Sequence, residues 1–339
     1  MTFQTASEKD MLQARWVTVV STARRYPTRF AIGALFLFAY LHYIFARSSW
    51  LPSLPRSSTT KHLTDSSGEP IPHKIWQIFF EYGNLGKAPL DDVKDFMNKW
   101  PTTNQDFSYM VISTEGGTDF ARKHYATRPE ILDPYLQLRL PILRADLLRY
   151  MLLESEGGIY SDLDSFPLHP FSEWVPQQYK GDVNFIVGIE YDQGNQDPYP
   201  GMSEPLQFCQ WTIASAPGHP IMRAAVTHVV ESLKSFARTN GTAIADLNLE
   251  DDDVIKVTGP KIWTSVIMET LADLTGEPVD HRNFTGITEP KLLADVLVLP
   301  INGFGTGQEH SNSTRIDGYT NPDAMVQHLW KGTWKHNWG

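Results

Sequence analysis

The sequence predicts an α/β domain with a largely parallel central sheet, beginning near residue 70. Short apolar segments of strand length alternate with longer segments of helical periodicity, and this alternation is typical of layered α/β folds. The chain has 339 residues and is 41% hydrophobic, which is enough to bury a sizeable core. Its ten Trp, thirteen Tyr and seventeen Phe exclude a chain that is disordered throughout.

The expected elements follow one another between residues 74 and 300. Runs of apolar and β-branched or aromatic residues predict strands over residues 74–80, 107–112, 159–164, 184–189, 206–214 and 295–300. Helical periodicity predicts helices over residues 91–100, 118–125, 141–154, 220–236 and 261–274. Helix 141–154 has the clearest bounds, because a proline opens it and Gly157 and Gly158 follow its end. The acidic stretch 246–253 lacks the spacing of an EF-hand, which favours a solvated loop.

Residues 30–46 predict a single transmembrane helix. They contain no Asp, Glu, Lys or Arg, although 17 residues is the short end of a bilayer span. Arg24, Arg25 and Arg29 precede the segment, and this excess of positive charge predicts a cytoplasmic tail over residues 1–29. A buried core helix and a cleaved signal peptide are the alternatives, but a signal peptide has a shorter leader and a small-x-small cleavage site. A retained anchor is therefore the preferred interpretation.

The rest of the chain is expected on the lumenal side of the membrane. Residues 47–69 are rich in Ser, Thr and Pro, a composition typical of a linker, and predict a stem. Residues 70–339 then form the lumenal globular domain. Sequons for N-glycosylation at Asn240, Asn283 and Asn312 support this orientation, so the pattern predicts a type II membrane protein of the secretory pathway.

Charge and cysteine content exclude several classes of protein. The formal net charge of −10 argues against binding to nucleic acid as the main function. One cysteine, Cys209, excludes a disulfide framework and any Cys-rich zinc module. A single free cysteine usually indicates a reducing compartment, which conflicts with the anchor and the sequons. Cys209 is accordingly expected to be a small buried hydrophobic residue.

The stretch Asp162-Leu163-Asp164 is the strongest candidate for chemistry. In an extended strand, residues two apart point to the same side, so both carboxylates can face one divalent cation. A cation held in this way stabilises the negative charge on a departing diphosphate. The pattern is common by chance, and its weight depends on its context.

That context is the preceding helix. Asp146 and Arg149 stand three residues apart and share one helical face. Together they can bind sugar hydroxyls, although a simple ion pair within the helix is the alternative. The two glycines after the helix let the chain reverse, which is expected to bring this pair and the two aspartates to one end of the sheet. Ligands of open α/β sheets bind at such an end.

Six blocks of sequence then resemble one family. They are IPHKIWQ (71–77), RADLLRY to GGIYSDLD (144–164), FCQWTIASAPGHPI (208–221), TGPKIWT (258–264), VLPINGFGTG (298–307) and HLWKGTWK (328–335). In this order they resemble the fungal initiation-specific α-1,6-mannosyltransferase family of DxD-containing retaining glycosyltransferases. The resemblance covers residues 71–335 and implies a GT-A-type, Rossmann-like nucleotide-sugar domain with a mostly parallel sheet.

The resemblance implies roles for individual residues. Asp162 and Asp164 match the motif that binds metal and diphosphate, and Asp146 and Arg149 match catalytic-site residues that contact the donor sugar. His328 resembles a histidine that completes the metal site, with a hydrogen-bonded structural histidine as the alternative.

Other matching positions concern the nucleotide. Trp76 and Tyr160 match positions near the nucleotide, with a core position as the alternative for Trp76. Gly332 and Lys335 fall where a loop closes over the diphosphate. Thr333 stands where serine is commoner and keeps the hydroxyl.

The implied reaction transfers mannose from GDP-mannose to a mannose of an N-linked glycan or mannan, with Mn²⁺ or another divalent cation. Linkage would be α-1,6, with retention of configuration, in the Golgi membrane. No carboxylate can be assigned as a covalent nucleophile from the sequence. Attack by the acceptor hydroxyl from the same face, with a diphosphate oxygen taking its proton, is at least as plausible. One alternative is a mannosyltransferase acting on inositol phosphoceramide, although that group usually has further membrane segments near the C-terminus. Another is a non-catalytic subunit of a Golgi mannosyltransferase complex.

Overall fold

The computed structural model describes the chain over residues 70–80, 93–197, 199, 202, 204–308, 313 and 321–330. The chain divides into two compact units, residues 1–63 and 64–339, and every described residue belongs to the second. The predicted tail, anchor and stem therefore lie outside the described residues. Within the described part of the chain, none of the helices has the length and apolar character needed to cross a bilayer.

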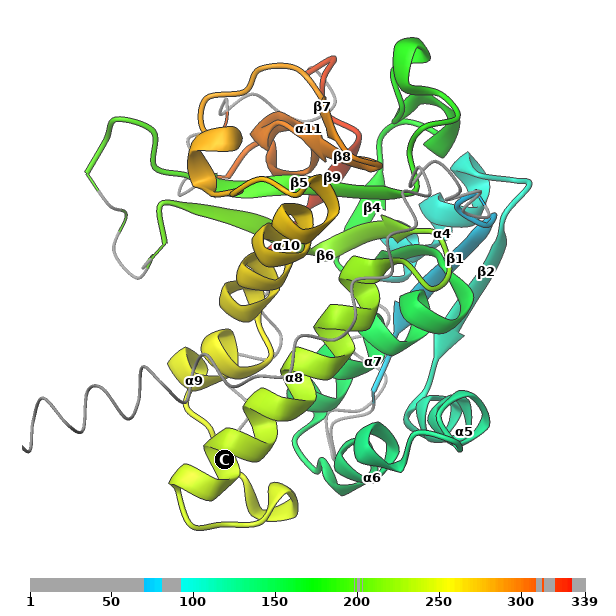
Figure 1. The fold of residues 1–339 in the computed structure, drawn as a ribbon. Coiled ribbons are helices and arrows are strands. Elements are labelled where there is room, and N and C mark those ends of the chain that lie inside the picture. Colours follow the sequence, from blue (N-terminus) through cyan, green and yellow to red (C-terminus); the bar gives the residue numbers. More distant parts are fainter. Residues whose placement is uncertain are drawn as a thin grey trace, which may run out of the picture. The chain divides into compact units, whose positions relative to one another are not determined.

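A seven-stranded mixed sheet forms the centre of the described domain (Figure 1). Its strands are β1 (Lys74–Ile78), β2 (Ser108–Ile112), β3 (Gly158–Ser161), β5 (Phe185–Asp192), β6 (Leu206–Ser215), β7 (Lys291–Leu293) and β8 (Val296–Leu299). They lie in the order β2-β1-β3-β6-β5-β8-β7. β1 is parallel to β2 and β3, and β5 is parallel to β8, whereas β6 is antiparallel to both its neighbours and β7 to β8. The α/β class is confirmed, with β6 and β7 running against the other strands of this sheet.

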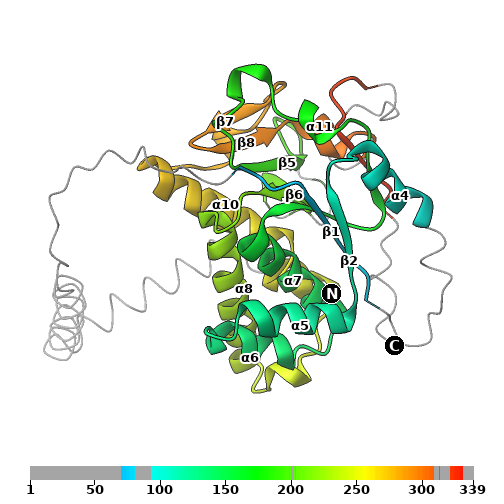
Figure 2. The same cartoon turned by 90° about the vertical axis from the view of Figure 1, so that its right-hand side faces the viewer.

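Helices cover both faces of this sheet. They are α4 (Lys94–Thr103), α5 (Thr114–His124), α6 (Pro129–Gln137), α7 (Pro141–Glu156), α8 (Pro220–Thr239), α9 (Asp251–Val257), α10 (Pro260–Thr275) and α11 (Ile301–Gly305). Short 3₁₀ turns span Phe171–Glu173, Gln177–Tyr179, Ile244–Asp246 and His281–Asn283. Figure 2 shows α7, α8 and α10 on one side of the sheet and α11 on the other. The larger apolar cluster fills the first side, and a second cluster around Trp100, Trp174 and Phe304 fills the other.

A separate two-stranded sheet brings the C-terminal part of the domain to the end of β3. It pairs β4 (Ser165–Pro167) with β9 (Val326–His328) in antiparallel register, with Ser165 opposite His328. The Leu329 N–H also donates to the Asp164 carbonyl, at 2.9 Å. His328 is thereby placed beside the aspartate motif.

The end of α7 has the geometry that its sequence predicts. Pro141 occupies the first turn, and the Gly157 N–H closes the helix on the Leu153 carbonyl at 3.1 Å. Gly157 and Gly158 both have positive φ, at 61° and 102°. A Cβ on Gly158 would lie 2.5 Å from the Lys74 carbonyl oxygen, so the start of β3 requires glycine.

Two local predictions are wrong. The strand predicted over residues 159–164 ends at Ser161, and the next three residues form a turn closed by the Ser165 N–H on the Asp162 carbonyl, at 3.1 Å. The acidic stretch 246–253 is not a loop throughout, because its last three aspartates form the first turn of α9. Negative side chains are favourable there, since the N-terminus of a helix carries partial positive charge.

The sequons fall on different parts of the domain. Asn240 is exposed at the C-terminal end of α8, and Asn283 ends a short 3₁₀ turn in which its Oδ1 accepts the Asp280 N–H at 2.9 Å. Asn312 lies outside the described residues. The prediction for Cys209 is confirmed, since the residue is fully buried and its thiol pKa is raised by that burial.

Candidate active site

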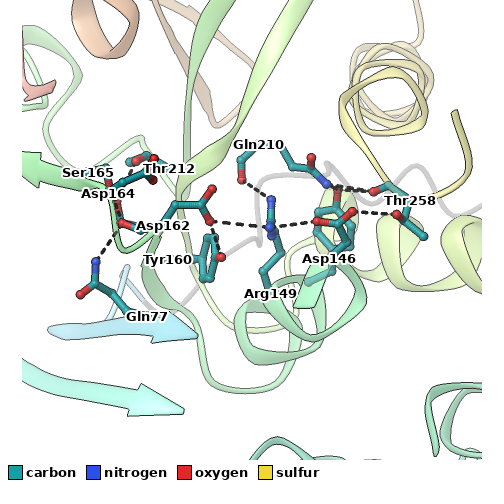
Figure 3. Close-up of polar contacts among 12 residues, drawn as sticks. Gln77, Asp146, Arg149, Tyr160, Asp162, Asp164, Ser165, Gln210, Thr212 and Thr258 are labelled. Carbon is teal, nitrogen blue, oxygen red and sulfur yellow. Dashed lines mark hydrogen bonds and ion pairs between the residues drawn. The ribbon is translucent and has the colours of Figure 1, made fainter. Parts of the chain in front are cut away.

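The turn that carries Asp162 and Asp164 is fixed through its backbone (Figure 3). The Asp162 N–H donates to the Trp211 carbonyl on β6, at 2.9 Å. The Asp162 carbonyl accepts from the Gln77 side-chain amide at 2.9 Å and from the Ser165 hydroxyl at 2.6 Å. The backbone of the turn is therefore held on both sides, which fixes the position of the two carboxylates that it carries.

Asp162, Asp164 and His328 form a cluster that fits a divalent cation. One ligand atom from each lies within 4.8 Å of the others, and His328 Nε2 is 3.1 Å from Asp164 Oδ1. The Asp162 side chain is 30% exposed, so the cluster keeps an open side. Two carboxylates and one imidazole suit cations such as Mn²⁺ or Mg²⁺, which accept oxygen ligands and retain positions for water or phosphate.

A chain of charges connects this cluster to α7. Arg149 Nη2 lies 2.9 Å from Asp146 Oδ1 and 3.6 Å from Asp162 Oδ1. Arg149 Nη1 donates to the Gln210 carbonyl on β6, at 3.3 Å. Asp146 and Arg149 are both buried, with exposed fractions of 3% and 5%. The arginine therefore joins the helix, the central strand and the aspartate turn.

Asp146 is held at both of its carboxylate oxygens. Oδ1 faces Arg149, and Oδ2 accepts a 2.7 Å hydrogen bond from the Thr258 hydroxyl. The Gln210 amide in turn donates to the Thr258 carbonyl and the Tyr150 hydroxyl. Burial raises the pKa of Asp146 to about 6, although the Arg149 charge opposes that rise. Near neutral pH the carboxylate is ionised and held in one orientation.

Tyr160 lies beneath the arginine. Its ring centre is 4.9 Å from the Arg149 guanidinium carbon, and its hydroxyl donates to Asp162 Oδ1 at 2.5 Å. Burial raises the pKa of Tyr160 well above its ordinary value, so the hydroxyl stays protonated and remains a donor. Tyr160 thus contacts the aspartate motif directly.

The remaining predicted residues are placed differently. Trp76 is 5% exposed, and its indole N–H donates to the Gly157 carbonyl at 2.8 Å, which makes it a core side chain in this structure. Its contact with a nucleotide stays a prediction, and stacking on a base would require the ring to be uncovered. Gly332 and Lys335 lie outside the described residues.

The sequence reasoning missed four residues that hold the site together. They are the residues that touch the aspartate turn or orient the α7 pair: Gln77, Gln210, Trp211 and Thr258. Each lies inside one of the six blocks that resemble the mannosyltransferase family. Membership of those blocks is the signal by which they could have been found, because their spacing along the chain gives no local pattern.

The same region matches known glycosyltransferases. Residues 91–180 match the family described as glycosyltransferase sugar-binding region containing DXD motif. The initiation-specific α-1,6-mannosyltransferase of Schizosaccharomyces pombe is 35% identical over 269 residues, which cover 78% of this chain and 64% of that protein. The match thus spans less than two thirds of that relative's length. The protein of the same name from Candida albicans is 28% identical over 84% of this chain and 78% of its own length.

Among solved structures, the PaToxG glycosyltransferase aligns with a TM-score of 0.40 and 18% identity, over 62% of this chain and 73% of that one. The sequence matches extend well beyond the aspartate motif and include the helix that carries Asp146 and Arg149. The chain therefore belongs to the initiation-specific α-1,6-mannosyltransferase family of glycosyltransferases.

Proposed function

We propose that the protein transfers mannose from GDP-mannose to a mannose of an N-linked glycan or mannan, forming an α-1,6 linkage with retention of configuration. The observation that carries this proposal is the continuous arrangement of Asp146, Arg149 and Asp162 beside His328 and Asp164. It combines a pair able to bind sugar hydroxyls with a cluster able to hold a cation. The names of the relatives support mannose as the transferred sugar.

Each part of the arrangement has a separate task in this proposal. Asp162, Asp164 and His328 would hold Mn²⁺ or a related cation, which supplies positive charge beside the diphosphate of the donor. Asp146 accepts hydrogen bonds from sugar hydroxyls, and Arg149 keeps that carboxylate ionised and oriented. Both oxygens of Asp146 are already engaged, which favours positioning of the sugar over covalent attack by this residue. We therefore favour same-face attack by the acceptor hydroxyl, with its proton passing to a diphosphate oxygen.

The first test uses the full-length protein in detergent with radiolabelled GDP-mannose, Mn²⁺ and an α-mannoside acceptor. Asp162→Asn and Asp164→Asn should each lower transfer by a factor of about 100 or more, because each removes a charged ligand. Asp119→Asn, a change to an exposed aspartate on α5, is the matched control and should leave transfer unchanged. Wild-type rates in both motif variants would contradict the proposed site. Transfer from UDP-glucose but not GDP-mannose would contradict the donor.

The acceptor is tested by product analysis. Digestion with a linkage-specific α-1,6-mannosidase should release the added mannose, and NMR of the anomeric proton should show the α configuration. Mannosylation of inositol phosphoceramide in place of the α-mannoside would favour the alternative substrate. Absence of turnover with any of these acceptors, in protein that binds GDP-mannose, would favour a non-catalytic subunit.

We further propose a single-pass type II protein of the Golgi membrane, with residues 30–46 as the anchor. The support is in the sequence: an apolar segment, the arginines before it and sequons after it. In sealed microsomes, an epitope at residue 1 should be digested by added protease while the domain is protected. Asn240→Gln should remove one glycan-dependent mobility shift.

A further inference from the structure

Trp211 contacts two of the three candidate cation ligands, Asp162 and His328. Its backbone carbonyl accepts the Asp162 N–H at 2.9 Å. Its indole ring stacks on the His328 imidazole, with ring centroids 4.4 Å apart and planes inclined by only 10°. Asp162 follows β3 and His328 ends β9, so these two candidate ligands come from distant parts of the sequence. One residue of the central strand β6 is therefore the common neighbour of both.

Aromatic side chains packed against the His328 imidazole ring hold it in its orientation. Nε2 is directed to Asp164 Oδ1, whereas Nδ1 is buried and has no hydrogen-bond partner among the described residues. Metal-binding histidines usually donate their second ring N–H to a carboxylate or carbonyl that fixes the ring. Here Trp211 covers one face of His328, and Trp330 meets the ring edge-on with centroids 3.9 Å apart. Packing against Trp211 and Trp330 thus orients the His328 ring, a role that a hydrogen bond to Nδ1 usually fills.

The Trp211 ring, rather than its N–H, makes this contact. The side chain is buried with 4% exposure, and its indole N–H has no acceptor among the described residues. A buried donor without a partner is unfavourable, so the packing of the flat ring must offset that loss. Stacked aromatic pairs gain energy from their faces, which is the geometry seen between Trp211 and His328.

We propose that Trp211 is a positioning residue that holds His328 in the orientation in which Nε2 binds the divalent cation. The inference rests on the proposed metal-dependent function. It concerns the ring alone, because the backbone hydrogen bond to Asp162 survives any substitution of the side chain. Variants of Trp211 therefore change the contact with His328 and leave the contact with Asp162 in place.

The experiment measures Mn²⁺ binding to the full-length protein in detergent by electron paramagnetic resonance, without any donor. Trp211→Leu should raise the Kd for Mn²⁺ about tenfold, the usual effect of losing a group that orients a ligand. Trp211→Phe keeps a flat ring and removes the N–H, and its Kd should stay within about threefold of wild type. Phe208→Leu is the matched control, because it removes a buried ring of the same strand that meets Phe284 edge-on and does not contact His328, and its Kd should not change.

Mannose transfer gives a second readout. In Trp211→Leu the Mn²⁺ concentration for half-maximal activity should rise about tenfold, while kcat at saturating Mn²⁺ stays within about twofold of wild type. A purely structural role would instead lower the folded fraction and leave the half-maximal concentration unchanged. If thermal unfolding shows that Trp211→Leu does not fold, Trp211→Met fills a similar volume without a flat ring and replaces it.

His328→Ala separates failure of this inference from failure of the proposed site. If His328→Ala binds Mn²⁺ as the wild type does, the proposed cation site itself is wrong. If His328→Ala weakens binding and Trp211→Leu does not, the site stands and the role of Trp211 is wrong. A Trp211→Phe variant as weak as Trp211→Leu would also overturn the inference, because the N–H would then be the essential group.

Discussion

The Thr258 hydroxyl donates a 2.7 Å hydrogen bond to Asp146 Oδ2, across 112 positions of sequence. Because Arg149 engages the other oxygen, the Asp146 carboxylate is oriented by groups from two different helical segments. Thr258 itself is fully buried and caps the C-terminal end of α9, two residues before α10 begins. The orientation of the residue proposed to bind the sugar therefore depends on the junction between α9 and α10, from which Thr258 reaches α7.

Thr258→Val tests that dependence. Valine has nearly the same shape but no hydroxyl, so Asp146 Oδ2 loses its buried donor, and we expect kcat/KM for GDP-mannose to fall about tenfold, equivalent to about 1.4 kcal/mol. Thr258→Ser keeps the hydroxyl and should remain within about threefold of wild type. Steady-state kinetics at saturating Mn²⁺ distinguishes the two. Equal rates in the serine and valine variants would mean that the hydrogen bond has no role in catalysis.

The pKa of Asp146 predicts opposite effects of pH on stability and on activity. Its folded-state pKa of about 6 lies above the ordinary value of 3.8, so folding favours the protonated form. The stability that this group contributes is complete below about pH 4 and is lost as pH rises through 6, a change of about 3 kcal/mol. Activity should show the reverse dependence, falling below about pH 6 as the ionised partner of Arg149 disappears.

Asp146→Asn removes the titrating carboxyl group and so tests the predicted pH dependence of stability and activity. Urea unfolding in EDTA at pH 4.5 and pH 7.5 should show the wild type losing stability relative to Asp146→Asn as the pH rises. The pH profile of kcat/KM should show an acidic limb near pH 6 in the wild type. A stability difference that is independent of pH would mean that Asp146 does not titrate in this range.

Gln77→Leu tests how the aspartate turn is held. It removes the hydrogen bond to the Asp162 carbonyl, whose remaining side-chain donor is Ser165. We expect the half-maximal Mn²⁺ concentration to rise about fivefold, corresponding to the usual net energy of one hydrogen bond. Tyr109→Phe removes only the hydroxyl that donates to Gln77 and should have a smaller effect on the same titration. A larger effect of Tyr109→Phe than of Gln77→Leu would contradict the proposal that Tyr109 acts on the aspartate turn only through Gln77.

Gly158→Ala tests the sharp reversal after α7. The added Cβ would lie 2.5 Å from the Lys74 carbonyl oxygen at a φ of 102°, and we expect a loss of stability of about 3 kcal/mol or more. Gly276→Ala is the matched control, since that glycine also has positive φ but has open space around its Cβ position. It should lose about 1 kcal/mol. Thermal unfolding of both variants gives the comparison, and equal losses would exclude the steric contact as the cause.

Local sequence signals were enough for the elements that carry the site. Pro141 begins helix α7 and Gly157 caps its end, and each residue affects only the backbone within a few positions of itself. The pairing of Asp146 with Arg149 follows from helical spacing alone. Predictions of this kind succeed because the physical cause and the residue that reveals it lie close together in sequence.

The turn at Asp162 could not be predicted in the same way. The turn is held by two contacts that are distant in sequence: the Gln77 amide donates to the Asp162 carbonyl, and the Trp211 carbonyl accepts the Asp162 N–H. Thr258 likewise reaches Asp146 only in the folded chain. In α9 the aspartates resembled a solvated loop because the pattern of charges does not reveal a helix N-terminus.

The pairing of β4 with β9 also has a consequence for biosynthesis. His328 reaches the cation cluster only after the segment 321–330 has left the ribosome and docked against Ser165. All seven strands of the central sheet, as well as α7 and the aspartate turn, precede that segment in the chain. The growing polypeptide would therefore carry an incomplete cation site until β9 is made, and a chain that terminates ahead of β9 would lack both His328 and the core residue Val326.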